Sequence, residues 1–352
     1  MSGRSTDYHR GGKMNGRIRW LDISRGFLII LVVLAHCMVP RVVFSFLSYL
    51  VAGYLFISGY LHKDRPFGIL VVRRFTRLII PYFVMGFMNI AIFFVTQLFI
   101  TELNFTFLET QKKFLLVYLG PGEVPYSLSP LWYLPMFFMV EVFYGMFRKL
   151  HLTYAGIVLG LLVPFFGRTK LPWEIDTALF GLIFFHIGVL YRRFKLKVRK
   201  PLLLLSSSIV ILSLVVKYNG LVDLNTKYYG TFPLLTFVGE ICYIGIIIGF
   251  SALIEKRHFS KVLELFGRNT LFILGYHIVI GIPLYLIFSR FMDPIAFVRK
   301  YWYIYFCLNI SIVYLLIRFL PGKVIHLFTG ELLTAQIQGR GAKIPQKVVT
   351  MD

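Results

Sequence analysis

Long apolar runs, separated by short charged or turn-rich segments, follow one another along this chain. A helix that crosses the hydrocarbon core of a bilayer needs about 20 predominantly apolar residues. The pattern predicts a series of such helices, each bounded by charged or turn-forming residues. Their predicted ranges are 24–40, 43–62, 78–101, 131–147, 152–167, 176–191, 202–217, 230–254, 270–289 and 302–320. We therefore predict an all-α fold, a polytopic transmembrane helical bundle of about ten spans.

Composition supports this fold class. Of the 352 residues, 57% are hydrophobic and only 15% are charged, which is typical of a membrane protein rather than of a soluble domain. The strands of a membrane β-barrel would instead show short segments of alternating hydrophobicity. We predict a membrane-embedded domain over residues 21–320, a tail over 1–20 before it and a tail over 321–352 after it.

The positive charge predicts the orientation of the chain. The formal net charge is +22, and most of the 38 lysines and arginines fall on one side when the N-terminus is placed inside. Because basic loops stay in the cytoplasm, we predict an N-in, C-in, multi-pass protein of the inner (cytoplasmic) cell membrane, with both tails cytoplasmic and its basic loops beside anionic membrane lipid. No basic domain or recognition motif indicates a nucleic-acid partner. The cysteines form no metal-ligand pattern, so no metal site is predicted.

The first apolar run contains a histidine, and titratable groups inside membrane helices are costly and commonly functional. His36 follows Arg25 by eleven positions, which on a continuous helix places both on one face, about 16 Å apart along the axis. This pattern predicts a catalytic histidine at position 36. The structural alternative is a histidine that only bonds across helices. Asp22 would either cap this helix or orient Arg25.

Glu141 places a carboxylate within the predicted helix 131–147. Its predicted depth in the membrane is close to that of His36, and a buried carboxylate needs a partner. Such a pair would orient the imidazole of His36 and stabilise its protonated form. The alternative is a structural tie to any arginine, tyrosine or tryptophan. Glu240 is a weaker candidate of the same kind.

Basic residues stand at the cytoplasmic mouth of the predicted helix 78–101. They are Arg73, Arg74 and Arg77. Arg74 and Arg77 are three positions apart, so on a helix they point the same way. Guanidinium groups bind phosphate through paired hydrogen bonds, which makes these residues candidates for phosphate binding. The alternative is a topological anchor or a contact with lipid headgroups.

Small and hydroxylated residues stand at the inner end of the predicted helix 43–62. Gly59 would permit the close approach of another backbone. Ser58 and Tyr60, on either side of it, offer hydroxyl groups for polar contacts. Ordinary helix packing is the alternative interpretation of this segment.

Together these segments resemble acyltransferase family 3, the integral membrane O-acyltransferases that modify surface polysaccharides. The resemblance runs from about residue 17 to residue 320. Its segments are Leu21-Asp22 before Arg25-Gly26, Arg25-x10-His36, Ser58-Gly59-Tyr60, Arg74-x-x-Arg77, LWYLPMFFMVE, FFHIGVLYRR and LFGRNTLFILGYH. Two positions depart from the usual pattern, His186 in place of an apolar residue and Thr270 in place of serine. We expect a stand-alone member, without the extracellular hydrolase-like domain attached in some relatives.

The resemblance implies an acyltransferase domain over 21–320 that transfers an acyl group, most often acetyl, from cytoplasmic acyl-CoA to a sugar hydroxyl. Acetyl-CoA or another acyl-CoA would be a co-substrate, with no permanently bound cofactor, and a surface polysaccharide or lipid-linked glycan would be the acceptor. His36 would act as general base, with Glu141 as its orienter. Ser58 or Tyr60 would donate a hydrogen bond to the developing oxyanion. The donor phosphates would meet Arg25, Arg73, Arg74 and Arg77.

Several alternatives stay open at this point. An acyl-enzyme route through His36, Ser58 or a tyrosine competes with direct transfer. A transporter or glycan exporter would also have many spans and buried charges. A shuttle would pass the acyl group to a separate extracytoplasmic transferase. The sequence leaves open the acceptor, the choice of acetyl over another acyl group, and a homo-oligomeric state.

Overall fold

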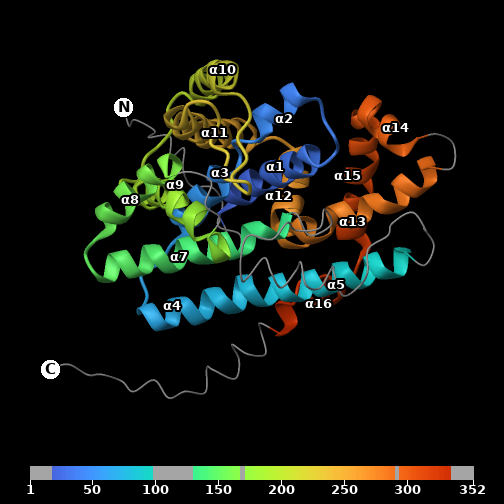
Figure 1. The fold of residues 1–352 in the computed structure, drawn as a ribbon, viewed down its shortest axis with the longest axis horizontal. Helices are drawn as coiled ribbons and strands as arrows, with labels where there is room; N and C mark the ends of the chain where they lie inside the picture. The colour runs from blue at the N-terminus through green and yellow to red at the C-terminus, as the bar shows by residue number, and fades with distance from the viewer. Residues whose placement is uncertain (1–17, 98–129, 167–170, 290–292, 334–352) are drawn as a thin grey trace, which may run out of the picture.

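Helices make up most of the structure, a computed structural model that describes residues 18–97, 130–166, 171–289 and 293–333 (Figure 1). About 81% of these residues are helical, and none of them belongs to a β-strand. The backbones of Asp223 and Tyr228 form an isolated antiparallel bridge in the loop between two helices. The predicted all-α class is confirmed.

The helices follow the apolar segments of the sequence. In chain order the α-helices are α1 (Arg19–Ala35), α2 (Arg41–Leu47), α3 (Val51–Leu61), α4 (Phe67–Arg74), α5 (Ile80–Gln97), α7 (Tyr133–Lys149), α8 (Thr153–Leu162), α9 (Ile175–Arg193), α10 (Pro201–Asn219), α11 (Pro233–Ile254), α12 (Ser260–Arg268), α13 (Thr270–Ser289), α14 (Pro294–Lys300), α15 (Trp302–Phe319) and α16 (Gly322–Phe328). A π-helical turn, η1 (Phe75–Ile79), joins α4 to α5. The 3₁₀ turns η3 (Val163–Phe165) and η4 (Pro172–Glu174) lie between α8 and α9.

Seven helical segments within the described ranges are long and apolar enough to cross a membrane. They are Arg41–Leu61, Phe67–Ile92, Pro130–Lys149, Pro172–Arg193, Pro201–Asn219, Pro233–Ile254 and Trp302–Phe319. An eighth would consist of α12 and the first part of α13, which meet at an angle of 87°. The predicted count of ten is not confirmed. The predicted spans 24–40 and 152–167 correspond to shorter helices, α1 with 17 residues and the segment Thr153–Phe165.

Most of the two predicted tails, 1–20 and 321–352, lies outside the described residues. The described beginning of the second tail forms α16, which packs against α5. The N-in, C-in orientation stays a prediction.

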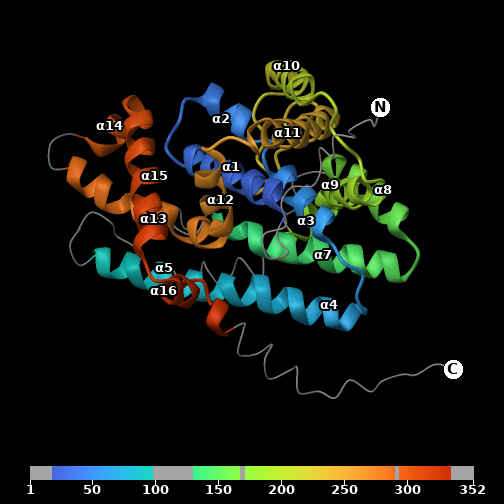
Figure 2. The same cartoon turned by 180° about the vertical axis from the view of Figure 1, so that it is seen from behind.

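The helices pack around α1. The segment α4, η1 and α5 runs as one long rod along one side of the molecule, with α7 beside α4 and η1 (Figures 1 and 2). α10 and α11 pack together on the opposite side, and α13, α14 and α15 form one end. α1 lies between these groups and contacts α3, α11, α12 and α13. Its residues Leu28, Ile29 and Val33 are fully buried for this reason.

Glycines bring two pairs of helices to backbone contact. A Cβ atom on Gly26 of α1 would overlap the carbonyl oxygen of Leu263 in α12. A Cβ atom on Gly59 of α3 would overlap the carbonyl oxygen of Phe185 in α9. The close approach predicted at Gly59 is therefore confirmed. Both contacts fix helices that carry candidate site residues against the rest of the bundle.

α1 ends earlier than the predicted helix 24–40. It ends at Ala35, and His36 is its C-terminal cap residue with φ −92° and ψ 6°. Pro40 explains this end, because proline lacks the N–H that would bond the carbonyl of His36, and its ring would clash with that carbonyl. Met38 takes a positive φ of 50° in the turn toward α2. His36 therefore lies at the end of the helix, and the prediction that it lies inside a longer one is wrong.

Candidate functional site

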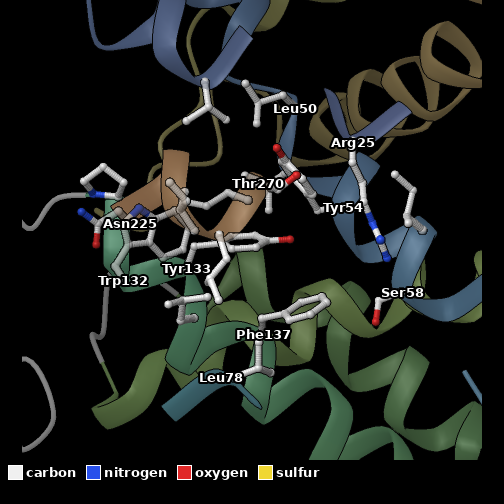
Figure 3. Close-up of a pocket in the computed structure, with 18 of the residues that line it drawn as sticks. Arg25, Leu50, Tyr54, Ser58, Leu78, Trp132, Tyr133, Phe137, Asn225 and Thr270 are labelled. Atoms are coloured by element: carbon white, nitrogen blue, oxygen red, sulfur yellow. The ribbon is translucent and has the colours of Figure 1, made fainter. Parts of the chain in front are cut away.

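A cavity of about 740 Å³ lies between α1, α3, the α4–η1 segment, α7 and α13 (Figure 3). Most of the predicted site residues line it, namely Arg25, His36, Ser58, Arg73, Arg74 and Arg77. Glu141 and Tyr60 do not. The volume is typical of sites that enclose a small-molecule ligand. The fold thus brings six residues from distant parts of the sequence to one space.

One end of the cavity is strongly basic. The basic residues among the described residues that line the cavity are Arg25, Lys63, Arg65, Arg73, Arg74, Arg77 and Arg268. Asp22 lies beside two of them: its Oδ1 is 3.7 Å from Nη1 of Arg25, and its Oδ2 is 3.9 Å from Nε of Arg268. Asp22 therefore does orient Arg25, and it does not cap α1, whose N-cap residue is Ile18. The positive charge at this end favours a ligand that carries several negative charges.

A π-helical turn interrupts the basic segment. Arg73 and Arg74 close α4, and Arg77 follows within η1. All three side chains belong to the wall of the cavity. π-Helical turns inside longer helices are frequent at functional sites, because the wider turn changes the direction of the side chains that follow.

The other end of the cavity combines aromatic and polar groups. It is lined by His36 at the end of α1, Trp132 before α7, and Asp223 and Asn225 in the α10–α11 loop. Helix α1 sets the separation of the two ends, because Arg25 and His36 are eleven residues, or about 16 Å, apart along its axis. Figure 3 shows Trp132 and Asn225 on the left of the cavity, and Arg25 on its right.

Glu141 is fully buried, and residues from α3, α4 and the turn between them hold its carboxylate. Its Oε1 accepts a hydrogen bond of 2.7 Å from the hydroxyl of Ser58 and lies 2.9 Å from Nη2 of Arg74. Its Oε2 lies 3.6 Å from Nδ1 of His62. The predicted pairing of Glu141 with His36 is therefore wrong. α7 packs against α4 and η1, so its buried carboxylate meets the basic end of the cavity instead.

His36 is oriented by its own helix. Its Nδ1 donates a hydrogen bond of 2.8 Å to the carbonyl oxygen of Val32. A carbonyl oxygen only accepts, so in the neutral ring Nδ1 carries the proton and Nε2 carries the lone pair. The buried ring of His277 in α13 lies edge-to-face against it, with ring centroids 5.0 Å apart. This tautomer is the one that makes Nε2 a base.

Tyr60 points away from the cavity. Its ring packs edge-on against Trp20 of α1, with centroids 5.1 Å apart, and is tilted against Tyr191 of α9 at 6.2 Å. The sequence placed Tyr60 beside Ser58 as a second hydroxyl donor. Residues two positions apart on a helix are separated by about 200°, however, so Ser58 and Tyr60 face different neighbours.

Tyr54 and Tyr133 line the cavity instead. Tyr54 precedes Ser58 by one helical turn, and Tyr133 begins α7. Their ring centroids are 5.7 Å apart, and Figure 3 shows both rings between the two ends of the cavity. Both hydroxyl oxygens are buried and have no hydrogen-bond partner in the described part of the chain. Leaving a buried hydroxyl unpaired is costly, which is typical of a group that meets a ligand.

Glu240, the weaker carboxylate candidate, supports the end of a helix. It is fully buried in α11, and its Oε2 accepts a hydrogen bond of 2.8 Å from the backbone N–H of Ala52. Ala52 lies in the first turn of α3, where backbone N–H groups have no partner within the helix.

Comparison with known protein families matches residues 18–318 to acyltransferase family 3, described as an acyltransferase domain. The chain belongs to acyltransferase family 3. The match covers both ends of the cavity. No curated protein and no solved structure matched the chain. Its family and its apolar helices together identify it as a multi-pass membrane acyltransferase.

The sequence did not predict some residues that line the cavity of this acyltransferase. Tyr54 and Tyr133 lie in aromatic and apolar runs, where they look like core residues. The spacing of Tyr54 and Ser58 could have indicated that Tyr54 faces the same space as Ser58, because residues four positions apart share a helix face. Asp223 and Asn225 lie in an irregular loop, and a loop has no periodic pattern that would indicate which side chains face a cavity.

Proposed function

We propose that this acyltransferase moves an acyl group, most often acetyl, from cytoplasmic acyl-CoA to a hydroxyl of a surface polysaccharide or lipid-linked sugar at the inner membrane. The observation that carries the proposal is a continuous cavity with a cluster of basic side chains at one end and His36 at the other. Such a cavity can hold a polyanionic donor and an uncharged acceptor at the same time.

The basic end suits the phosphates of acyl-CoA. Arg74 is held by the carboxylate of Glu141, and Arg73 and Arg77 complete the wall beside it. Further basic residues belong to the same end of the bundle: Arg148 pairs with Asp64, and Arg192 donates to the carbonyl oxygen of His62. Basic ends of membrane helices are cytoplasmic. This supports a donor that enters from the cytoplasm.

His36 acts as the general base in the proposed reaction. Its Nε2 takes the proton of the acceptor hydroxyl as that oxygen attacks the carbonyl carbon of the thioester. A C–O bond forms, and the carbonyl oxygen becomes an oxyanion. The C–S bond then breaks, and the proton on His36 passes to the departing sulfur. The products are a sugar ester and free CoA thiol.

The hydroxyls of Tyr54 and Tyr133 supply the hydrogen bonds to the oxyanion. Ser58 already donates its proton to Glu141, and Tyr60 lies outside the cavity. Neither tyrosine hydroxyl has a hydrogen-bond partner among the described residues, so they need no rearrangement when negative charge develops. They replace Ser58 and Tyr60 in the role expected from the sequence.

Tyr54→Phe and Tyr133→Phe are each expected to lower kcat by about 10²–10³-fold, the usual cost of one oxyanion donor. Phenylalanine keeps the ring and removes only a hydroxyl that bonds to no described residue, so the thermal midpoint of unfolding should stay the same or rise. Tyr60→Phe is the matched control and should keep the wild-type kcat. If both cavity variants kept the wild-type kcat, the hydroxyls would have no role in the reaction.

A transfer assay tests the proposed function against a transporter and a shuttle. Purified protein in lipid discs receives acetyl-CoA with a labelled acetyl group, and the glycan fraction extracted from cells that lack this gene. We expect label on the glycan as an ester that mild base removes, together with free CoA thiol. Label that stays on acetyl-CoA would support a transporter, and label that stops on the protein would support a shuttle.

The mass of the protein after incubation with acetyl-CoA alone separates the two chemical routes. Direct transfer leaves the protein mass unchanged. An acyl-enzyme adds an acetyl group to His36, Ser58 or a tyrosine.

A further inference from the structure

The loop between α10 and α11 forms part of the cavity wall, and a buried asparagine fixes both of its ends. Asn219 has no exposed surface and closes α10. Its Nδ2 donates hydrogen bonds of 3.0 Å to the hydroxyls of Tyr49 and Thr236. Its Oδ1 accepts a hydrogen bond of 2.6 Å from the backbone N–H of Phe232, at the far end of the loop. The loop is therefore closed by side-chain contacts.

A buried lysine fixes the tip of the same loop. Lys227 is only 3% exposed, and its ammonium group donates to Glu174 and Thr177 and lies 3.1 Å from Oδ1 of Asp176. Asp176 and Thr177 lie in the first turn of α9, and Glu174 is its N-cap residue. Separating such a buried ion cluster would leave uncompensated charge, which is costly. The loop is thus a preformed wall.

This wall turns polar groups toward the cavity. Oδ1 of Asp223 accepts hydrogen bonds of 3.1 and 3.3 Å from the backbone N–H groups of Asn225 and Thr226, which fixes the carboxylate. Its Oδ2 has no hydrogen-bond partner among residues that the structure describes. The same holds for the side-chain amide of Asn225 and for the indole N–H of Trp132, which also line the cavity.

We infer that Trp132, Asp223 and Asn225 form the acceptor subsite for an uncharged sugar ring, an inference that rests on the proposed function. A sugar ring has apolar C–H faces and a rim of hydroxyl groups. The flat indole of Trp132 packs on such a face. The carboxylate of Asp223 accepts from the rim hydroxyls, and the amide of Asn225 both accepts and donates. In ligand sites of this kind, a few fixed polar groups beside an aromatic surface orient the ligand.

Charge separates this subsite from the donor. Asp223 is the acidic residue among the described residues that line the cavity, and the basic side chains lie at the other end. Asp223 would repel the phosphates of acyl-CoA, so the donor is held at the basic end. A sugar ring that carries its own carboxylate or phosphate would be repelled as well. The subsite therefore selects a neutral ring and presents its hydroxyl to His36.

Steady-state kinetics with separate variation of donor and acceptor test this subsite. The acceptor is again the glycan fraction from cells that lack the gene, and the donor is labelled acetyl-CoA. Trp132→Leu, Asn225→Ala and Asp223→Asn are each expected to raise the KM for the glycan about tenfold or more, because each removes a polar or aromatic group that faces the acceptor. The KM for acetyl-CoA should stay within about twofold of wild type.

Thr231→Ala is the matched control, because Thr231 is an exposed residue of the same loop that does not line the cavity. It should leave both KM values unchanged. Asp223→Asn keeps an oxygen that can accept the two backbone N–H groups, so it tests the charge without opening the turn.

The outcomes separate the subsite from the proposed function. If wild-type protein moves no label to the glycan, the proposed function fails and the subsite fails with it. If wild-type protein transfers label but the variants keep the wild-type KM for the glycan, or raise the KM for acetyl-CoA instead, the subsite alone is overturned.

Discussion

A His36→Ala variant is expected to lose acyl transfer by about 10²–10⁴-fold, the usual contribution of a general base. The ring of His36 donates from Nδ1 to Val32, so the lone pair lies on Nε2. Removing the ring removes that base. In the proposed function the donor phosphates bind at the basic end, about 16 Å along α1 from His36, so the affinity for acetyl-CoA should be retained.

Two measurements separate a catalytic loss from unfolding. Binding of acetyl-CoA to His36→Ala is compared with wild type by calorimetry, and transfer of label is measured on the same preparation. His258→Ala is the matched control, because His258 is exposed and does not line the cavity. A folded, donor-binding His36→Ala protein that transfers acetyl at the wild-type rate would rule out His36 as the base.

Glu141→Ala is expected to destabilise the protein by about 3–5 kcal/mol, the cost of breaking a buried ion pair by removing one partner. The Arg74 guanidinium would lose its carboxylate, and the Ser58 hydroxyl would lose its acceptor. Activity should fall with stability, because this contact positions Arg74 in the wall that we propose to face the donor. The readouts are the thermal midpoint of unfolding in detergent and the KM for acetyl-CoA.

A second ion pair on the same helix provides the control for this prediction. Arg148 of α7 pairs with Asp64, and their side chains are 45% and 65% exposed. Exposed pairs contribute only about 0–1 kcal/mol, so Arg148→Ala should shift the midpoint little. Glu141→Gln keeps an oxygen that accepts from Ser58, so its midpoint of unfolding should lie between those of Glu141→Ala and Arg148→Ala. Equal midpoints for Glu141→Ala and Arg148→Ala would show that the buried contact with Arg74 stabilises the protein no more than the exposed pair does.

The apolar pattern predicted the helices well, because a membrane segment must satisfy its backbone groups within itself. It predicted their ends less well. Pro40 ends α1 before position 40, and α12 and α13 meet at a sharp angle near Asn269. Such bends depend on local backbone chemistry, which a run of apolar residues does not encode. The structure therefore has helices at all ten predicted positions, but fewer segments with the length and composition of a span.

The site was predictable where it depends on one helix. Arg25 and His36 share α1, and Arg73, Arg74 and Arg77 share the α4–η1 segment, so their spacing was informative. Glu141 was recognised as a buried carboxylate that needs a partner. Its actual partners could not be chosen from the sequence, because the choice among histidine, arginine and serine depends on which helix packs beside α7.

The most direct test is a sided reconstitution. A Cys307→Ser background removes the exposed native thiol, and Lys149→Cys then marks the basic end of the bundle. A thiol reagent that cannot cross the membrane shows which face of sealed proteoliposomes carries this cysteine. Labelled acetyl-CoA is then supplied on one face and the unacylated glycan on the other. We predict transfer when the donor is on the face of the marked cysteine and the glycan is on the opposite face. Transfer only when donor and glycan share one face would contradict a cavity that joins a cytoplasmic donor to an outer acceptor.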